Sequence, residues 1–164
     1  MISMIIQVLG AFFAAIVLSI LFEIPRRHIL WDGVVGALGW LTYLLVAKVG
    51  SLAIAVCVAS MVISLCSNVL ARIQKAPSTA FAIPGMLPLV PGVSIYRGVY
   101  YMMINDTQKS SHYLIEALQI AAMLAFGLLL METIFRFVSN MAAQKLHRTF
   151  ERHSDKHKNI KEGK

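Results

Sequence analysis

Long apolar runs separated by short polar segments dominate the chain and predict several membrane-spanning helices. Four runs of bilayer-relevant length contain no Asp, Glu, Lys or Arg, and a fifth contains three charged residues. A spanning helix needs about 20 mainly apolar residues, and Trp or Tyr favours its interfacial ends. We therefore expect an all-α polytopic membrane bundle of about five helices, which lie near residues 3–22, 30–48, 51–71, 78–105 and 113–138.

Composition strengthens this interpretation and excludes a soluble enzyme domain or a disordered protein. Apolar residues make up 58% of the 164 residues and charged residues only 14%, against roughly 25% charged residues in a soluble domain. No nucleophile–base pair, phosphate-binding loop or HExxH motif occurs in the sequence, so we expect neither catalysis nor a cofactor. The first apolar run has no basic segment before it and is longer than a signal peptide core, so it is expected to be a retained helix.

The distribution of Lys and Arg predicts the orientation, because cytoplasmic loops are enriched in both residues. The net charge is +7, and much of it falls after the last apolar run. With five spans and the N-terminus outside, Arg26, Arg27, Arg72, Lys75 and Arg136 lie on the cytoplasmic side together with the basic C-terminal segment. We therefore expect a transmembrane domain over residues 1–140 and a basic cytoplasmic tail over residues 141–164.

The fourth apolar run contains prolines and glycines that a straight helix cannot accommodate. Proline removes a backbone donor and clashes with the preceding helical turn, and three prolines and two glycines fall between residues 84 and 92. Irregular backbone at membrane depth is tolerated only where protein buries it or where it lines a wet cavity. We expect a discontinuous helix, with one half near 78–84, a hinge at 85–91 and a second half near 92–105. The residues of the break are Pro84, Gly85, Pro88, Pro91 and Gly92.

The start of the second half-helix is a candidate anion site. Free N–H groups and the helix dipole favour negative charge there. Ser94 is placed to cap the helix or to bond a ligand, and Arg97 one turn later is costly to bury without an anion. A carboxylate ligand suits all three features. The alternative is a structural kink, with Arg97 reaching the outer interface.

Small and polar residues recur at helical spacing along the third span. Such a stripe lets helices approach closely and hydrogen-bond, or lines a polar path, and the two roles are compatible. Gly33, Gly36 and Gly39 in the second span also suit close helix contact. Cys57 and Cys66 are too far apart along the helix for a disulfide. The stripe consists of Ala53, Cys57, Ser60, Ser64, Ser67, Asn68 and Ala71, of which Ser60, Ser64 and Asn68 are the candidates for lining a pathway.

Few acidic residues are available for chemistry within the spans. Glu116 is the candidate for a titratable carboxylate on a pathway, although an interfacial acid near a helix N-terminus is the favoured interpretation. Glu132 and Arg136 are spaced to form an ion pair on the last span. Glu23 and Asp32 flank the first cytoplasmic loop and are expected to be interfacial.

The C-terminal segment mixes basic residues with a few acids. His153 and His157 have a spacing that a metal can use, but no further ligand accompanies them, so we expect no metal site. The segment suits attraction to anionic lipid headgroups. No aromatic pattern or fold motif favours nucleic acid as a partner.

The proline–glycine segment also carries a family resemblance. Residues 75–98, which end in FAIPGMLPLVPGVSIYRG, resemble the signature of the threonine/serine exporter family, and Phe22 and Pro25 fit as well. The likeness covers roughly residues 10–138 and corresponds to the family's C-terminal half, which in many bacteria is a separate small subunit. The matched positions are Pro84, Gly85, Pro88, Pro91, Gly92, Tyr96, Arg97 and Gly98.

The resemblance implies a transport function and a partner. Family members export threonine and serine, and a related two-subunit bacterial pair is linked to succinate export. All three substrates carry a carboxylate. The family's N-terminal half supplies further spans, so the resemblance implies a larger membrane subunit beside this chain in the bacterial inner membrane. The leading hypothesis is an exporter subunit that works by alternating access. The alternatives are a non-transporting assembly subunit, whose partner carries the pathway, and a homo-oligomeric channel.

Overall fold

The chain folds almost entirely into helices. The computed structural model describes residues 2–162, with side chains for residues 2–139 and for Met141. A single 3₁₀ turn, η1 (Leu87–Leu89), interrupts the series. The α-helices are α1 (Ile2–Leu21), α2 (Arg26–Val46), α3 (Leu52–Gln74), α4 (Ser78–Met86), α5 (Gly92–Met103) and α6 (Thr107–Glu162).

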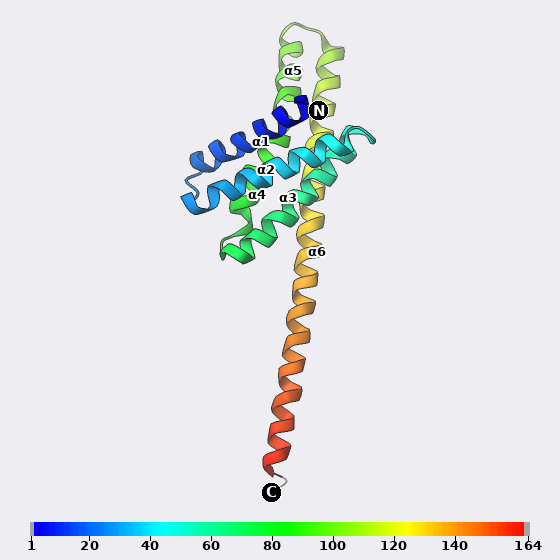
Figure 1. Ribbon diagram of the computed structural model, residues 1–164. Coiled ribbons are helices and arrows are strands. Elements are labelled where there is room, and N and C mark those ends of the chain that lie inside the picture. Colours follow the sequence, from blue (N-terminus) through cyan, green and yellow to red (C-terminus); the bar gives the residue numbers. More distant parts are fainter. Residues whose placement is uncertain (1, 163–164) are drawn as a thin grey trace.

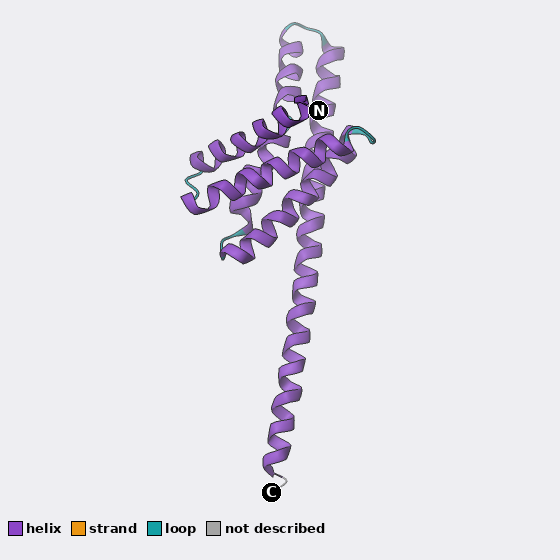
Figure 2. Ribbon diagram, in the orientation of Figure 1, coloured by secondary structure: helices purple, strands orange, loops and turns teal. Residues whose placement is uncertain are grey.

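The helices form a layered bundle crossed by one long helix. α1, α2 and α3 lie side by side in chain order, and α4 packs against both α2 and α3 (Figure 1). α5 and the first part of α6 form a hairpin, and α6 then crosses α3 and continues well beyond the bundle (Figure 1). Short loops connect most neighbouring helices (Figure 2), as antiparallel packing of neighbours requires. The prediction of an all-α polytopic bundle is confirmed.

The span count agrees with the apolar pattern. α1, α2, α3 and residues 107–139 of α6 are each long and apolar enough to cross a membrane. The segments 78–89 and 92–103 together make a fifth candidate, bent by 47° at the break. α6 continues as one helix through Glu162, so the backbone of the predicted tail is an extension of the last span. His153 and His157 have side chains outside the described residues.

The break in the fourth span is shorter than the sequence predicts. Helix α4 runs through Pro84 to Met86, and η1 continues the turn to Leu89. The prediction that residues 85–91 are non-helical is therefore wrong for most of that range. Pro88 is tolerated in the first turn of η1, where its missing N–H has no intrahelical partner to lose. Pro84 lies inside α4, where it removes one helical hydrogen bond without ending the helix. Only Val90 and Pro91 separate the two halves before α5 begins at Gly92.

Local signals place the turns. The Ser51 hydroxyl accepts from the amide of Ile54 at 3.5 Å and caps α3. Lys75 ends the same helix in the left-handed conformation, with φ of 52°. In the turn before α6, hydrogen bonds from the side chain and amide of Lys109 hold the pKa of the Asp106 carboxyl below its usual 3.8.

The core lies where α3 meets α2, η1 and α6. Its buried side chains are aliphatic, and half-buried Trp40, Tyr43 and Met86 pack against them. Side chains at Gly33 and Gly36 would collide with α1, and one at Gly39 would collide with α3, so the prediction of close contact there is confirmed. The buried cluster comprises Val35, Val56, Ala59, Ile63, Leu89, Ile120 and Leu124.

Candidate functional site

A polar cavity lies between α3, the first half of the broken span and α6. Its volume is about 190 Å³, and small hydroxyl and amide side chains supply much of its lining. Methionine and aliphatic residues form the remainder, so the cavity combines an apolar wall with convergent polar groups, as small-molecule sites do. The lining residues are Ser64, Ser67, Asn68, Ser78, Thr79, Ala82, Ile83, Met86, Leu128 and Glu132.

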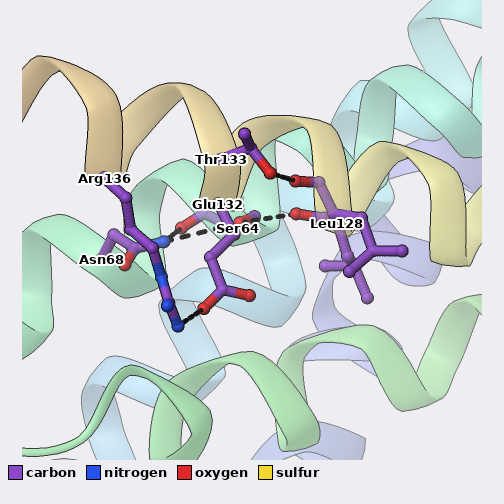
Figure 3. A network of polar contacts seen from close by, with 7 residues as sticks. Ser64, Asn68, Leu128, Glu132, Thr133 and Arg136 are labelled. Carbon is purple, nitrogen blue, oxygen red and sulfur yellow. Dashed lines mark hydrogen bonds and ion pairs between the residues drawn. The ribbon is translucent and has the colours of Figure 1, made fainter.

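Hydrogen bonds organise the α3 wall of this cavity against α6. Asn68 Nδ2 donates to the Ser64 carbonyl at 2.9 Å, and Ser64 Oγ donates to the Leu128 carbonyl at 3.4 Å (Figure 3). The hydroxyl of Ser67, one turn from Ser64, is fully buried and has no hydrogen-bond partner among the described residues. A buried donor without a partner is costly, and this hydroxyl has no surface open to the cavity in this conformation.

Glu132 is the charged residue that lines the cavity. Its carboxylate accepts from Arg136 one turn later on α6 at 2.6 Å (Figure 3), which confirms the ion pair that the spacing predicts. The Glu132 side chain is 39% exposed and that of Arg136 is 76% exposed. The acid therefore lines the cavity, whereas Arg136 is more exposed and is not among the lining residues.

The first turn of α4 faces the same cavity. No side chain among the described residues caps this helix, and Pro77 occupies the capping position. The N–H groups of a helix's first turn have no intrahelical acceptor, and Ser78 and Thr79 line the cavity at this point. The site thus places an acid, unused amide donors and hydroxyl groups around one small space.

The polar residues along one face of α3 have two roles: some pack against α6 and others line the cavity. Ser60 donates to the Cys57 carbonyl at 2.8 Å and lies against Gly127 of α6. Ser64 and Asn68 line the cavity instead. Helix packing and cavity lining therefore occupy successive turns of one helix face.

The prolines of the hinge separate into two environments. Pro84 and Gly85 are buried, and Gly85 lies against Val35 of α2. Pro88 and Pro91 line a second cavity of about 170 Å³ between α2, α3, α5 and α6. The indole N–H of Trp40, which also lines this cavity, has no hydrogen-bond partner among the described residues.

The remaining candidates lie around or away from these cavities. Ser94 lines the second cavity but makes no capping bond to α5. Gly92 is exposed with open space beside it. Arg97 is exposed, and its guanidinium lies 5.6 Å from the ring centre of Tyr113 on α6. Glu116 is half-buried on α6 and lines neither cavity.

The two acids near the first turn differ in their burial. Asp32 is fully buried between α1 and α2, and it accepts a hydrogen bond from Ser19 of α1 at 2.7 Å. Glu23, its predicted counterpart in the turn, is exposed. A sequence signal was present, because Asp32 precedes Gly36 by four residues and Gly39 by seven and so shares their packed helix face.

Comparison with known proteins identifies this arrangement of helices. Residues 7–134 match the family described as "Threonine/Serine exporter, ThrE". The chain belongs to the threonine/serine exporter family. The resemblance seen in the proline–glycine segment is thereby confirmed over most of the chain. No solved structure matches it.

Two bacterial exporters are similar to parts of this chain. A threonine/serine exporter of Corynebacterium glutamicum is 34% identical over 94 residues, which are 57% of this chain and 19% of that protein. A probable threonine/serine exporter of Mycobacterium tuberculosis is 26% identical over 129 residues, 77% of this chain and 24% of that protein. The chain therefore corresponds to a quarter or less of the relatives' length.

Sequence reasoning about this exporter-family chain missed three cavity residues. Ser78 and Thr79 were not singled out, because hydroxyl residues that follow a proline at the start of a helix are typical of a helix cap. Glu132 was assigned only to its ion pair. All three residues lie where α3, α4 and α6 converge. The spacing of residues along the chain does not predict which helices converge, so the sequence alone could not group them.

Proposed function

We propose that this chain is a subunit of a bacterial inner-membrane exporter of threonine and serine, and that it acts with a larger membrane subunit by alternating access. The observation that carries this proposal is the polar cavity beside the broken span. Its volume of about 190 Å³ suits a small metabolite. Family membership supports transport as the class of function.

The chemistry of the cavity favours an amino acid over a dicarboxylate. Glu132 offers a carboxylate to an ammonium group, and the amides at the start of α4 offer donors to a carboxylate. The hydroxyl of Thr79, which lines the cavity, is placed to bond the side-chain hydroxyl of threonine or serine. Succinate has no ammonium group, so neither of its carboxylates gains a favourable partner in Glu132.

The two cavities suggest how access alternates. Along α3, Val56 lines the second cavity and Ser64 the first, and the buried Ala59 and Ile63 lie between them. Along α6, buried Leu124 lies between the Ile120 and Leu128 linings. In this conformation a packed layer thus separates the cavities. Flexing at residues 84–92 would open that layer, since η1 contributes Leu89 to it.

Export from loaded cells tests the proposal. Efflux of labelled threonine, serine and succinate is measured for this chain alone, for the larger subunit alone and for both together. We expect efflux of threonine and serine only with both, reduced at least tenfold by Glu132→Gln. Glu116→Gln tests in parallel the acid that the sequence favours. Efflux with the larger subunit alone would make this chain an assembly subunit, and efflux with this chain alone would indicate a homo-oligomeric channel.

Cysteine accessibility separates a pathway from a docking surface. In a background that lacks Cys57 and Cys66, single cysteines replace Ser64, Asn68 and Ser94. If the chain lines the pathway, aqueous thiol reagents modify these positions and substrate slows the reaction. Cysteines that stay unreactive in the assembled complex would contradict the proposal.

A further inference from the structure

A second polar cluster, separate from the cavity, is buried between α1 and α2. Asp32 and Ser19 have no exposed surface, and His28, one turn before Asp32, is only 2% exposed. Ionisable residues inside membrane bundles are rare and costly, and they mark ion or proton pathways more often than structural sites. The candidate function described above uses none of these three side chains.

Only one of the two carboxyl oxygens of Asp32 has a hydrogen-bond partner among the described residues. Its Oδ2 atom accepts from Ser19 Oγ at 2.7 Å, whereas Oδ1 is buried and has no partner among the described residues. A buried carboxylate is tolerated when both oxygens are paired or when the group is neutral. A single proton on this carboxyl removes the charge from the site.

The neighbouring serine can serve either protonation state. Ser19 Oγ lies within hydrogen-bond distance of both Asp32 Oδ2, at 2.7 Å, and the Ala15 carbonyl, at 2.8 Å. A hydroxyl has one hydrogen and two lone pairs. When Asp32 is ionised, Ser19 donates to it. When Asp32 is protonated at Oδ2, the acid donates to Ser19, which then donates to Ala15. The chain of bonds reverses without moving a heavy atom.

His28 is the other titratable group that faces this acid. Its Nε2 atom accepts from Arg27 Nε at 2.8 Å, and its Nδ1 atom bonds Gln74 of α3. These partners fit a neutral imidazole with the hydrogen on Nδ1. Arg27 is exposed, so His28 lies between the aqueous end of α2 and Asp32.

The other elements around the cluster bring no competing charge. α1 and α4 contain no Asp, Glu, Lys, Arg, His, Cys or Tyr. On α3, the titratable side chains are Cys57, Cys66 and Arg72, and Arg72 lies 4.6 Å from the ring centre of Phe135 on α6. The charged residues of the nearby turns, Glu23, Arg26 and Lys75, are exposed.

Helix α4 joins this cluster to the polar cavity. One face of α4 carries buried Phe81, whose ring meets His28 edge to face at 5.4 Å, and Gly85, which packs on Val35 of α2. Another face carries Ser78 and Thr79 of the cavity. A change of charge at Asp32 and a change of ligand in the cavity therefore act on the same half-helix.

We propose that Asp32 is a proton-binding site through which proton entry is coupled to substrate export. A proton from the outer side binds the carboxylate as substrate leaves, and its release to the cytoplasm regenerates the carboxylate. The coupling rests on the exporter function proposed above. Asp32 acts through α4 and does not touch the substrate.

Two measurements on the full complex test the inference. Infrared difference spectra of the purified complex, recorded against pH, report the carboxylic acid C=O band without requiring transport. We expect a titrating band that Asp32→Asn removes and that the exposed-acid control Glu23→Gln retains. Titrating bands that are identical in the unmodified complex and in Asp32→Asn would overturn the assignment.

The second measurement uses vesicles that carry both subunits. A pH gradient should drive threonine movement in the unmodified complex and in Glu23→Gln, and Asp32→Asn should lose this response at least tenfold while exchange of labelled for unlabelled threonine persists. An unchanged response in Asp32→Asn, or a response to a sodium gradient alone, overturns the coupling. Absence of exchange in every sample would instead contradict the exporter function and leave the infrared result to decide the proton site.

Discussion

The environment of a single side chain in this protein depends on which residues of the neighbouring helix it contacts. Ser60, Ser64 and Ser67 lie within two turns of α3, yet the first packs against Gly127, the second bonds Leu128 and the third has an unpartnered hydroxyl. Asp32 and Glu23 are both acids near the first turn, yet one is fully buried and the other exposed. Residue type alone distinguishes none of these cases.

The contact between α3 and α6 at Gly127 should be sensitive to a single methyl group. A Cβ atom there would collide with Ser60 Oγ and lie 2.5 Å from the Cys57 carbonyl oxygen. We expect Gly127→Ala to lower the free energy of unfolding by about 1–3 kcal/mol, as overpacking typically does. Thermal unfolding of the detergent-solubilised protein measures the effect.

Gly10→Ala is the matched control for that substitution. Gly10 also lies within a helix, but no atom approaches within 4 Å of its built Cβ. Alanine is the better helix former, so this variant should be equally stable or slightly more stable. Equal destabilisation of both variants would show that α3 and α6 do not approach as closely as described.

At the scale of elements, the broken span is the distinctive feature. α4, η1 and α5 form one bent unit in which helical turns continue past two prolines and stop only at Val90 and Pro91. The first half separates the buried acid from the polar cavity, and the junction contributes Leu89 to the layer between the cavities. This unit therefore contacts both the buried polar cluster and the polar cavity.

Replacing Pro88 and Pro91 together by alanine should abolish export. Alanine restores two backbone donors and removes two rings, so η1 and α5 can join into a continuous helix that no longer flexes. We expect at least a tenfold loss of threonine efflux with an unchanged amount of protein in the membrane, measured by efflux and immunoblotting. Pro25→Ala, at the exposed start of α2, should retain efflux. Full efflux from the double variant would refute the hinge mechanism.

At the scale of the whole molecule, the bend of 47° has two topological interpretations. If residues 78–103 cross the bilayer, the chain has five spans and its ends lie on opposite sides. If they enter and return, it has four spans and both ends lie on the same side. The distribution of Lys and Arg favours five, with the C-terminal end of α6 in the cytoplasm.

Reporter fusions after residue 164 distinguish the two topologies. We expect an active cytoplasmic fluorescent reporter and an inactive periplasmic phosphatase at this position, with the opposite pattern for fusions in the turn between α5 and α6. An active phosphatase at the C-terminus would contradict the five-span prediction and indicate a re-entrant segment. Loss of the bias when basic tail residues are replaced by Gln would show that these charges set the orientation.

The sequence by itself determined the class of fold, the approximate spans and the family. Apolar length specifies spanning helices because the bilayer requires about 20 apolar residues, and proline chemistry specifies that the fourth span breaks. The spacing of Glu132 and Arg136 also specified their ion pair, because residues four apart meet on one helix face. These features depend only on residues that are close together in the sequence, so the local geometry of a helix is enough to predict them.

Only the tertiary structure decided which polar groups share a space. The polar cavity needs α3, α4 and α6 to converge, and Asp32 is buried because Gly33 and Gly36 let α1 approach α2 closely. The extent of the break was likewise decided by packing, since buried Pro84 and Leu89 hold helical turns that proline propensity disfavours. Contacts between segments that are distant in the sequence do not follow a periodic pattern along the chain. They therefore cannot be predicted from local spacing and are seen only in the packed helices.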